Sequence, residues 1–504
     1  MLVVLAVGLL TLSGLPALFT RSRAGEYASV VLVLAGAGAG LTGALSTLTT
    51  GTTARAAAEW NLPGATLALR LDPLAAAFLL PIFVLGALAS VYGLDYWPAH
   101  EHASAGRVRA FTGVLLAGMA TVVVAANGML FLVAWEAMAL AAFFLIAAED
   151  EDVEARGAAW LYLVATHIGT LLLFALFVVM RAERGTFLLG PLSSHTGTLT
   201  SSIVLLLAVA GFGFKAGIVP LHFWLPGAHA NAPSHVSAML SGAMLKVGVY
   251  GIIRVILFLP DPQLWWGGLL IVLGLTSALV AIALAIGQSD VKRTLAYSSI
   301  ENVGIITVAI GLGMIGRATG LRSLAILGFA AAIAHVWSHS LFKGLLFLCA
   351  GCVVHATGTR RLDHLGGLLH RMPVTGALFV VGAAAASALP GLNAFVSEWM
   401  LYVGLIGEAP RGSVTALAAA VIALVGALAV ACFVRLTGAI FLGSPRSDSA
   451  ATAHEASLLM RGPMVLLAIA CIALGVFPAA IAGALETITG APGSLTPLLR
   501  GLGL

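Results

Sequence analysis

Long apolar runs follow one another along almost the whole chain, separated by short polar stretches. A helix needs about 20 mainly apolar residues to cross a bilayer. The runs predict fourteen crossings, so we expect an all-α polytopic membrane protein. Its polar stretches are too short for a separate soluble domain. The expected crossings cover residues 2–20, 27–49, 73–94, 108–126, 128–147, 157–180, 201–229, 233–259, 264–287, 293–313, 321–356, 374–409, 412–442 and 463–485.

Lys and Arg are distributed unevenly between the two ends of these crossings. The odd-numbered loops carry more of them, Lys292 included, than the even-numbered loops do. Because basic loops stay in the cytoplasm, we expect both chain termini outside it and the protein in the plasma (inner) membrane. Arg21 and Arg23 follow the first apolar run rather than precede it, which favours a retained helix over a cleaved signal peptide.

Two crossings are interrupted by proline. The seventh holds Pro220 and Pro226, and the twelfth holds Pro390. Such breaks free backbone carbonyls that lipid cannot satisfy, so they occur only against protein or water. Paired interruptions in two halves of a chain are typical of inverted repeats with ion sites at the membrane midplane. We therefore expect an N-terminal part, two inverted five-helix repeats and a C-terminal part, covering residues 1–107, 108–259, 260–442 and 443–504.

Composition identifies lipid as the solvent. Of the 504 residues, 60% are hydrophobic and 9% are charged, whereas soluble proteins have about 25% charged residues. A soluble enzyme and a nucleic-acid-binding protein are thereby excluded, and the net charge of +4 is too small for a polyanion partner. Charged residues inside the crossings stand out, because each costs ~2.5–3.5 kcal/mol at the bilayer centre.

Glu136 and Lys215 are two such residues in the first half. Glu136 lies near the middle of the fifth crossing, where we expect a buried side chain. Lys215 lies five residues before Pro220, beside the first break. Burial and a nearby carboxylate act on a lysine in opposite directions, so the pair would form a charge switch. A purely structural ion pair is the alternative.

Lys246 lies deep in the eighth crossing, too far in for its side chain to reach the membrane surface easily. His235 precedes it by eleven residues, about three helical turns, so we expect the two to share a face. His222 and His229 flank the first break and could hydrate it.

His335, His339 and Lys343 are spaced four residues apart, which places them on one helix face over about 12 Å. Histidine titrates near neutral pH, so this row predicts a route for protons. A metal site is the rival interpretation. We expect no metal, because the HExxH glutamate is missing and Lys343 would repel a cation. The Cys349 and Cys352 pair is interpreted as apolar packing.

Two glutamates extend the pattern into the second half. Glu398 lies eight residues after Pro390 and is the counterpart of the first half's buried charge. Glu301 lies two to three turns into the tenth crossing, and either belongs to the route or lies near the membrane surface.

With these residues in place, the chain resembles the antiporter-like membrane subunits of respiratory complex I, Mrp-type sodium/proton antiporters and membrane-bound hydrogenases. The resemblance covers about residues 70–440. The segments HANAPSHVSAMLSG and SSIENVGI are most similar to the large membrane subunit of formate hydrogenlyase and hydrogenase-4 type complexes. The other specific segments are QSDVKRTLAYSS, HSLFKGLLFLCAGCVVHATGTRRLDHLGGL and PGLNAFVSEW.

The resemblance implies proton translocation through a fourteen-helix fold. By motif position, Glu136 matches the family's glutamate of helix 5, Lys215 the lysine of broken helix 7, and Lys246 the lysine of helix 8. His335, His339 and Lys343 match the row on helix 11, and Glu398 matches the site on helix 12. Some relatives continue into a long lateral helix. The sequence ends soon after the fourteenth run, so we expect that piece to be missing.

We therefore expect a proton-translocating subunit of a redox-driven complex, similar to a hydrogenase or an NADH dehydrogenase, that makes no bond itself. No haem, flavin, nucleotide or iron–sulfur motif occurs, so we expect no cofactor in this chain. Its partners would be other membrane subunits and a peripheral redox module. The alternatives are a cation/proton antiporter subunit, a membrane subunit that energises inorganic carbon uptake, and a passive scaffold. A scaffold gives no reason for bearing the cost of the buried charges.

Overall fold

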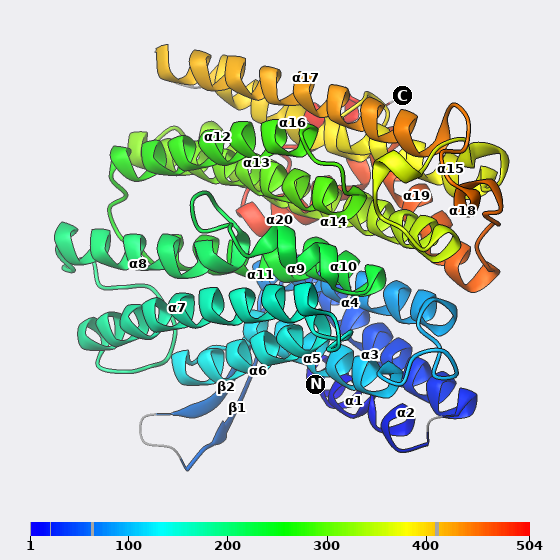
Figure 1. Cartoon of the computed structure of the whole chain (residues 1–504). Helices are drawn as coiled ribbons and strands as arrows, with labels where there is room; N and C mark the ends of the chain where they lie inside the picture. The colour runs from blue at the N-terminus through cyan, green and yellow to red at the C-terminus, as the bar shows by residue number, and fades with distance from the viewer. Residues whose placement is uncertain (1, 21, 62–64, 409–412, 504) are drawn as a thin grey trace.

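The chain forms a bundle of long, roughly parallel helices in a computed structural model (Figure 1). The structure describes residues 2–20, 22–61, 65–408 and 413–503. Thirteen helices within these residues are long and apolar enough to span a membrane. The expected twelfth crossing consists instead of two shorter helices. The expected polytopic helical fold is thereby confirmed.

The elements follow the order of the expected crossings, with several of them divided. The first half contains α1 (Leu2–Leu12), α2 (Leu15–Thr20), α3 (Arg23–Thr50), β1 (Ala54–Glu59), β2 (Thr66–Leu71), α4 (Pro73–Tyr96), α5 (Ala105–Val124), α6 (Gly128–Ile146), α7 (Val153–Arg184), α8 (Thr198–Ala216), α9 (Leu225–Asn231), α10 (Ser234–Met239) and α11 (Leu245–Ile256). The second half contains α12 (Leu264–Ile286), α13 (Val291–Thr319), α14 (Arg322–Thr357), α15 (Pro373–Ala386), α16 (Asn393–Tyr402), α17 (Ser413–Phe441), α18 (Asp448–Ala451), α19 (Leu458–Val476), α20 (Ala482–Thr489) and α21 (Thr496–Arg500).

A β-hairpin is the one departure from an all-α chain within the described residues. Strands β1 and β2 pair antiparallel, with Ala57 opposite Ala68. The β1 strand is exposed along its whole length, and the hairpin extends away from the helices in Figure 1. The sequence marked this region only as a polar stretch, because its short alternation of Ala with charged residues is a weak strand signal.

Both expected helix breaks are present. Helix α8 ends at Ala216, and Gly217 takes a positive φ of 81° while its N–H bonds to the carbonyl of Gly213. A left-handed residue at this position ends a helix, and glycine adopts it without steric cost. In the second half α15 ends at Ala386, and Gly391, with a φ of 85°, precedes α16. The expected inverted five-helix repeats stay a prediction.

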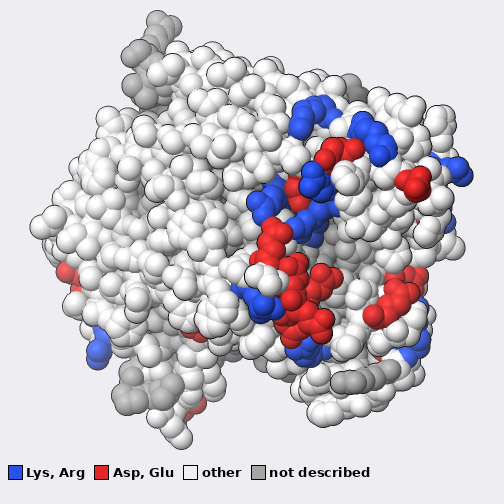
Figure 2. All heavy atoms as spheres, viewed as in Figure 1, with Lys and Arg blue, Asp and Glu red and all other residues white. Residues whose placement is uncertain are grey.

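Charged side chains gather at one end of the bundle (Figure 2). Arg360 pairs with Glu154 at 3.1 Å and with Asp290 at 2.8 Å, and Arg107 pairs with Asp150 at 3.2 Å. Because these residues come from different odd-numbered loops or helix ends next to them, the pairs place those loops on one side of the membrane. Which side that is stays a prediction.

Helices α12 and α13 approach each other through small residues. A Cβ atom on Gly304 would lie 2.6 Å from the backbone nitrogen of Ala278, and one on Gly274 would lie 2.6 Å from the carbonyl oxygen of Gly304. Glycines at such contacts let helix backbones approach closely within a membrane. The apolar window of α13 is buried throughout, and it carries Glu301 and Asn302 into the centre of the bundle.

Candidate functional site

Lys215 is completely enclosed near the C-terminal end of α8. Its Nζ donates hydrogen bonds to the hydroxyls of Tyr162 and Thr166, both at 2.9 Å and both on α7. The ammonium group also lies 5.4 Å from the ring centre of Trp135 and 4.8 Å from that of Tyr162. Hydroxyls and aromatic faces thus solvate this cation in place of a direct carboxylate partner.

Glu136 on α6 also contacts α7, and the hydroxyls of two α7 threonines lie between its carboxylate and Lys215. Its carboxylate accepts a hydrogen bond of 2.5 Å from Thr170, whose hydroxyl also lies 3.1 Å from the carbonyl oxygen of Thr166. Among the described residues no direct ion pair joins Glu136 to Lys215. Two hydroxyls in a row on α7 lie between them instead: that of Thr170 bonds to Glu136 and that of Thr166, one turn away, bonds to Lys215.

The expectation that Glu136 is buried is wrong. Its side chain is 29% exposed, and the Nε2 atom of His167, which is 51% exposed, lies 3.4 Å from the carboxylate. Helix periodicity turns this position of α6 toward the outside of the bundle, so the carboxylate lies at the protein surface. A charge exposed at this depth is costly in lipid.

The ammonium group of Lys246 contacts His339 directly. Nζ bonds to Nδ1 of His339 on α14 and, at 2.5 Å, to the carbonyl oxygen of Ser241. That carbonyl belongs to a π-helical turn, Leu240–Met244, between α10 and α11. A π turn alters the regular hydrogen bonding of a helix and is frequent at functional sites. Here one of its carbonyls helps to hold the buried cation.

Nε2 of His339 is buried without a hydrogen-bond partner. When Lys246 is charged it can only donate, so Nδ1 accepts and a neutral ring carries its proton on Nε2. An unpaired buried donor costs about 1–3 kcal/mol, and an ordered water often satisfies such groups. His229 has both ring nitrogens buried and unpaired as well, and it lies close enough to His339 to interact electrostatically.

His335 is held from both sides. Asn302 on α13 donates its amide N–H groups to Glu301 and to the carbonyl of Ser298, so its oxygen accepts from Nε2 of His335 at 3.0 Å. Ser397 on α16 lies 2.9 Å from Nδ1 and also 2.9 Å from the carbonyl of Ala394. The single hydroxyl proton of Ser397 can serve only one of these at a time.

Lys343 lies one turn beyond His339 on α14, and Glu301 lies on the neighbouring helix α13. Lys343 Nζ bonds to the carbonyl oxygen of Leu295 at 3.2 Å. Glu301 accepts from the hydroxyl of Ser298 at 2.8 Å and attracts Lys343 electrostatically without a direct contact. Glu301 is only 2% exposed, so its side chain faces the protein interior, and its membership of the route stays a prediction.

Glu398 lies at the outer end of this group. Its side chain on α16 is half-buried, and it interacts electrostatically with Glu301 and Tyr402. No described residue donates a hydrogen bond to its carboxylate. The second half therefore presents a carboxylate near its edge, as the first half does with Glu136, although Glu136 has partners in Thr170 and His167.

The three histidines of the first break lie apart from one another. His222 is half-buried with Nδ1 unpaired. The ring of His229 packs on Trp224 and Phe347. His235 packs against Tyr96 of α4 at 5.5 Å between ring centres, whereas Lys246 reaches α14. The spacing of eleven residues does not bring His235 and Lys246 to common contacts, because the π-helical turn between them shifts the helix register.

Lys292 is a buried lysine, although the hydropathy of the sequence predicted that it lies in a loop. Asp290 caps α13 by accepting a hydrogen bond from the backbone N–H of Arg293, so the helix starts at Val291. Lys292 is therefore in the first turn, 4% exposed, with Nζ bonded to the carbonyl of Ala232. The Asp at this helix start was the signal that could have revealed it.

Metal-binding side chains do not gather in threes anywhere in the described part of the chain. Cys349 and Cys352 both contact the sulfur of Met464, at 3.5 and 3.7 Å. The CxxC pair thus packs within an apolar sulfur cluster. Hydrogen bonding gives the lysines Lys215, Lys246 and Lys343, with the neighbouring hydroxyls and imidazoles, the capacity to hold and pass protons.

Known proteins are similar to this chain in sequence. The model of the family "NADH:quinone oxidoreductase/Mrp antiporter, TM" matches residues 125–425. Hydrogenase-4 component B of Escherichia coli is 40% identical over 81% of this chain and 62% of its own length. Formate hydrogenlyase subunit 3 of the same organism is 38% identical over 81% of this chain and 66% of its own length. The chain thus spans about two thirds or less of these relatives.

A solved structure supports the same relationship. The chain superposes on a subunit in the structure of the membrane-bound sulfane sulfur reductase, an archaeal respiratory membrane complex, with a TM-score of 0.84 and 25% identity. The match covers 97% of this chain and 78% of that subunit. Sequence and fold agree, and the chain belongs to the NADH:quinone oxidoreductase/Mrp antiporter transmembrane family.

Proposed function

We propose that the chain is a proton-translocating membrane subunit of a redox-driven complex. Its similarity to hydrogenase-4 component B and formate hydrogenlyase subunit 3 supports a complex of the membrane-bound hydrogenase class. The contact between Lys246 and His339 carries the proposal. It joins two titratable side chains on different helices, α11 and α14, in the buried centre of the bundle. An ammonium group next to a neutral imidazole can transfer its proton directly.

The route we propose runs along the bundle in two sets. The first set contains Glu136, the hydroxyls of α7 and Lys215. Gly248, just after Lys246, packs against Ala216, just after Lys215, so the first set meets Lys246 across a tight helix contact. The second set continues from His339 along α14 to Lys343 and Glu301, and ends at Glu398.

The exposed Glu136 supports a coupling role. A change of charge on a neighbouring subunit would act first on this carboxylate and on His167 beside it. The hydroxyl row would transmit the change to Lys215 by reorienting, because each hydroxyl can reverse its donor and acceptor roles. Oxidation and reduction would take place in a peripheral redox module. We place the chain in the plasma membrane with its odd-numbered loops in the cytoplasm and both termini outside.

Lys215→Ala in the assembled complex tests this proposal. Proton uptake into inverted membrane vesicles would be followed with a pH-sensitive dye while the electron donor of the complex is oxidised. We expect the variant to assemble and to lose proton uptake. Arg435→Ala is the matched control, because it removes an exposed cation bonded only to the carbonyl of Gln288. Undiminished uptake in Lys215→Ala would contradict the proposed route.

A cation/proton antiporter subunit is the second candidate, since the matching family includes Mrp antiporters. The same vesicles distinguish the two. Proton movement driven by a sodium gradient without an electron donor would favour the antiporter. Proton movement that depends on the donor favours the redox-driven subunit.

A further inference from the structure

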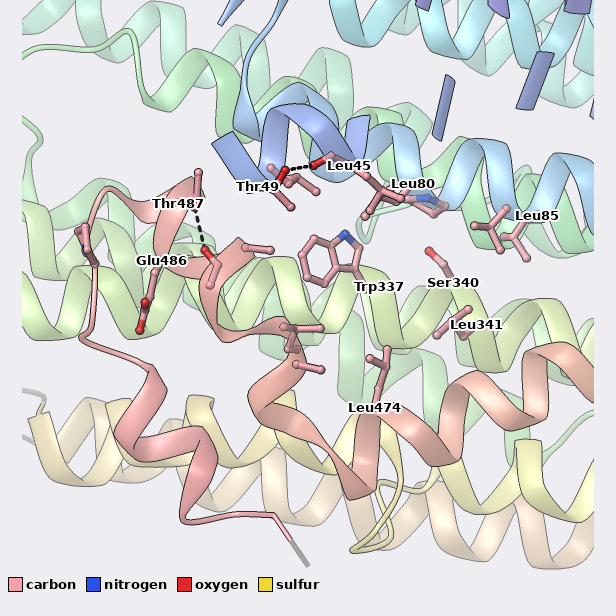
Figure 3. A pocket seen from close by; sticks show the side chains of 18 residues that line it. Leu45, Thr49, Leu80, Leu85, Trp337, Ser340, Leu341, Leu474, Glu486 and Thr487 are labelled. Carbon is pink, nitrogen blue, oxygen red and sulfur yellow. Dashed lines mark hydrogen bonds between the residues drawn. The ribbon is translucent and has the colours of Figure 1, made fainter. Parts of the chain in front are cut away.

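A large apolar cavity lies behind the proton route, on the opposite side of α14. Its volume is about 750 Å³, within the range of small-molecule sites. The walls come from α3, α4, α14, α19 and the segment around α20 (Figure 3). Leu45, Leu80, Leu85 and Leu474 project into it, and the indole of Trp337 lies in its middle.

The cavity is continuous with the surface that faces lipid. Leu45 lines it and is also 51% exposed. Helix α19 contributes Leu474 to the wall, and Leu466 and Ile469 on the same helix are exposed. Because these helices span the membrane, hydrocarbon from the bilayer can enter from the side.

The polar groups of the wall are already satisfied by the protein. Oε1 of Glu486 accepts hydrogen bonds from the backbone of Leu495 and Thr496 and from the Thr496 hydroxyl. Thr49 and Thr487 donate to carbonyls of their own helices. The indole N–H of Trp337 donates to the carbonyl of Ala77 and Ser340 donates to that of Gly242. Little remains to grip a polar head, so the chemistry fits a plain hydrocarbon chain.

The cavity is elongated along the bundle. Thr49 lies next to the last residue of α3, at the end of the bundle opposite the charged loops. Trp337 lies at the level of Ala77, one turn into α4 from that same end, and Leu85 at the other end of the wall lies twelve residues into α4, which is about 18 Å at the helical rise of 1.5 Å per residue. The slot therefore runs from one membrane surface toward the bilayer centre, as an extended acyl chain does.

We propose that this cavity binds one acyl chain of a membrane phospholipid, and that the acyl chain packs against the side of α14 opposite the proton route. Trp337, Ser340 and Leu341 line the slot, whereas His335, His339 and Lys343 on the same helix contact α11, α13 and α16. Ser340 also ties α14 to Gly242 in the π-helical turn before Lys246. A filled slot keeps these helices in register, and this part of the proposal rests on the proposed function.

A photoactivatable phospholipid with the reactive group on its acyl chain tests the site. The complex would be labelled in membranes, purified, digested and mapped by mass spectrometry. We expect labelled peptides from residues 337–341 and 480–492. Gly483→Leu should fill the slot, because a Cβ at Gly483 meets open space, and should abolish this labelling with the loss of one bound lipid per chain. Gly438→Leu on α17 is the matched control, since its Cβ also meets open space.

Labelling spread evenly over the lipid-facing helices, or unchanged in Gly483→Leu, would overturn the proposal. Labelling of the slot by a photoactivatable quinone ring would do so too, because it would show a polar-headed occupant. Donor-driven proton uptake in Gly483→Leu provides the functional readout, with assembly verified by size-exclusion chromatography, and we expect it to fall. If the wild-type complex moved no protons, slot labelling would still stand, so the two proposals fail separately.

Discussion

Lys246 and His339 are joined by a hydrogen bond between Nζ and Nδ1, with no carboxylate between them. When Lys246 is charged it can only donate, so Nδ1 of His339 must then be free of a proton. A second proton on His339 would place two cations side by side, so occupancy of either site by a proton disfavours the other. The pair is suited to passing a proton onward rather than to storing it.

Removal of the imidazole should therefore interrupt transport. We expect His339→Gln to assemble normally and to reduce donor-driven proton uptake by about a hundredfold, the lower end of what a positioned proton-transfer group contributes. Dye-monitored uptake in inverted vesicles would measure this. His235→Gln is the matched control, because His235 packs against Tyr96 away from Lys246. Equal losses in both variants would show that buried histidines matter only for packing.

The hydroxyl of Thr170 should be needed between the carboxylate of Glu136 and Lys215. Thr170→Val keeps the shape of the side chain and removes the hydroxyl that bonds to Glu136. We expect coupled proton uptake to fall while oxidation of the electron donor continues. Thr170→Ser restores a hydroxyl and should restore uptake. The idea fails if the valine variant pumps as well as the wild type.

The pair of Asp72 and Arg254 should make stability depend on acid. Arg254 donates two hydrogen bonds of 2.7 and 2.6 Å to Asp72. Burial alone would raise the pKa of Asp72, but the bonds and charge of Arg254 outweigh it and hold that pKa below the ordinary value of 3.8. The stability it contributes is complete above that value and is lost as the pH falls through the lowered pKa.

Asp72 also caps α4 by accepting a hydrogen bond from the N–H of Ala75. Asp72→Asn removes the charge but keeps this cap, because asparagine caps a helix equally well. We expect the variant to unfold about 3 kcal/mol more easily at neutral pH. It should also lose the dependence of stability on pH below about 4 that Asp72 contributes. Thermal unfolding of the purified protein across pH would measure both. A variant whose melting curve parallels the wild type at all pH values would contradict this.

The contact between α12 and α13 should not tolerate a methyl group. Gly304→Ala places a Cβ 2.6 Å from the backbone of Ala278, and such overpacking costs about 1–3 kcal/mol. We expect a lower melting temperature in detergent. Gly268→Ala on α12 is the control, because nothing lies near its Cβ, and it should melt like the wild type. A reversed order of the two variants would refute the close approach.

The sequence allowed most of the fold to be predicted, because lipid imposes strict rules on length and polarity. The row of His335, His339 and Lys343 followed from spacing alone. The threonines of α7 did not, because hydroxyl residues are common in helices and nothing marks the ones that bond to a charge. The π-helical turn before Lys246 was likewise hidden, since the residues Leu240–Met244 contain no proline.

The errors have physical causes too. The exposure of Glu136 depends on which side of α6 faces neighbours, and α6 is apolar all round, so periodicity could not decide. Lys292 was placed in a loop because hydropathy alone put the start of the tenth crossing too late. The cap at Asp290 begins that helix at Val291 instead.

Helix α13 also constrains how the chain is made. It is buried along its whole apolar window, and its inner positions carry Glu301, Asn302, Ser298 and Ser299. A newly synthesised helix with these groups would meet lipid on every side if it left the insertion machinery alone, and lipid offers them no partners. The glycine contact with α12, the preceding segment, gives it a companion at once. We infer that the two helices enter the membrane as a hairpin, and that the order of synthesis protects the polar centre until α14 arrives.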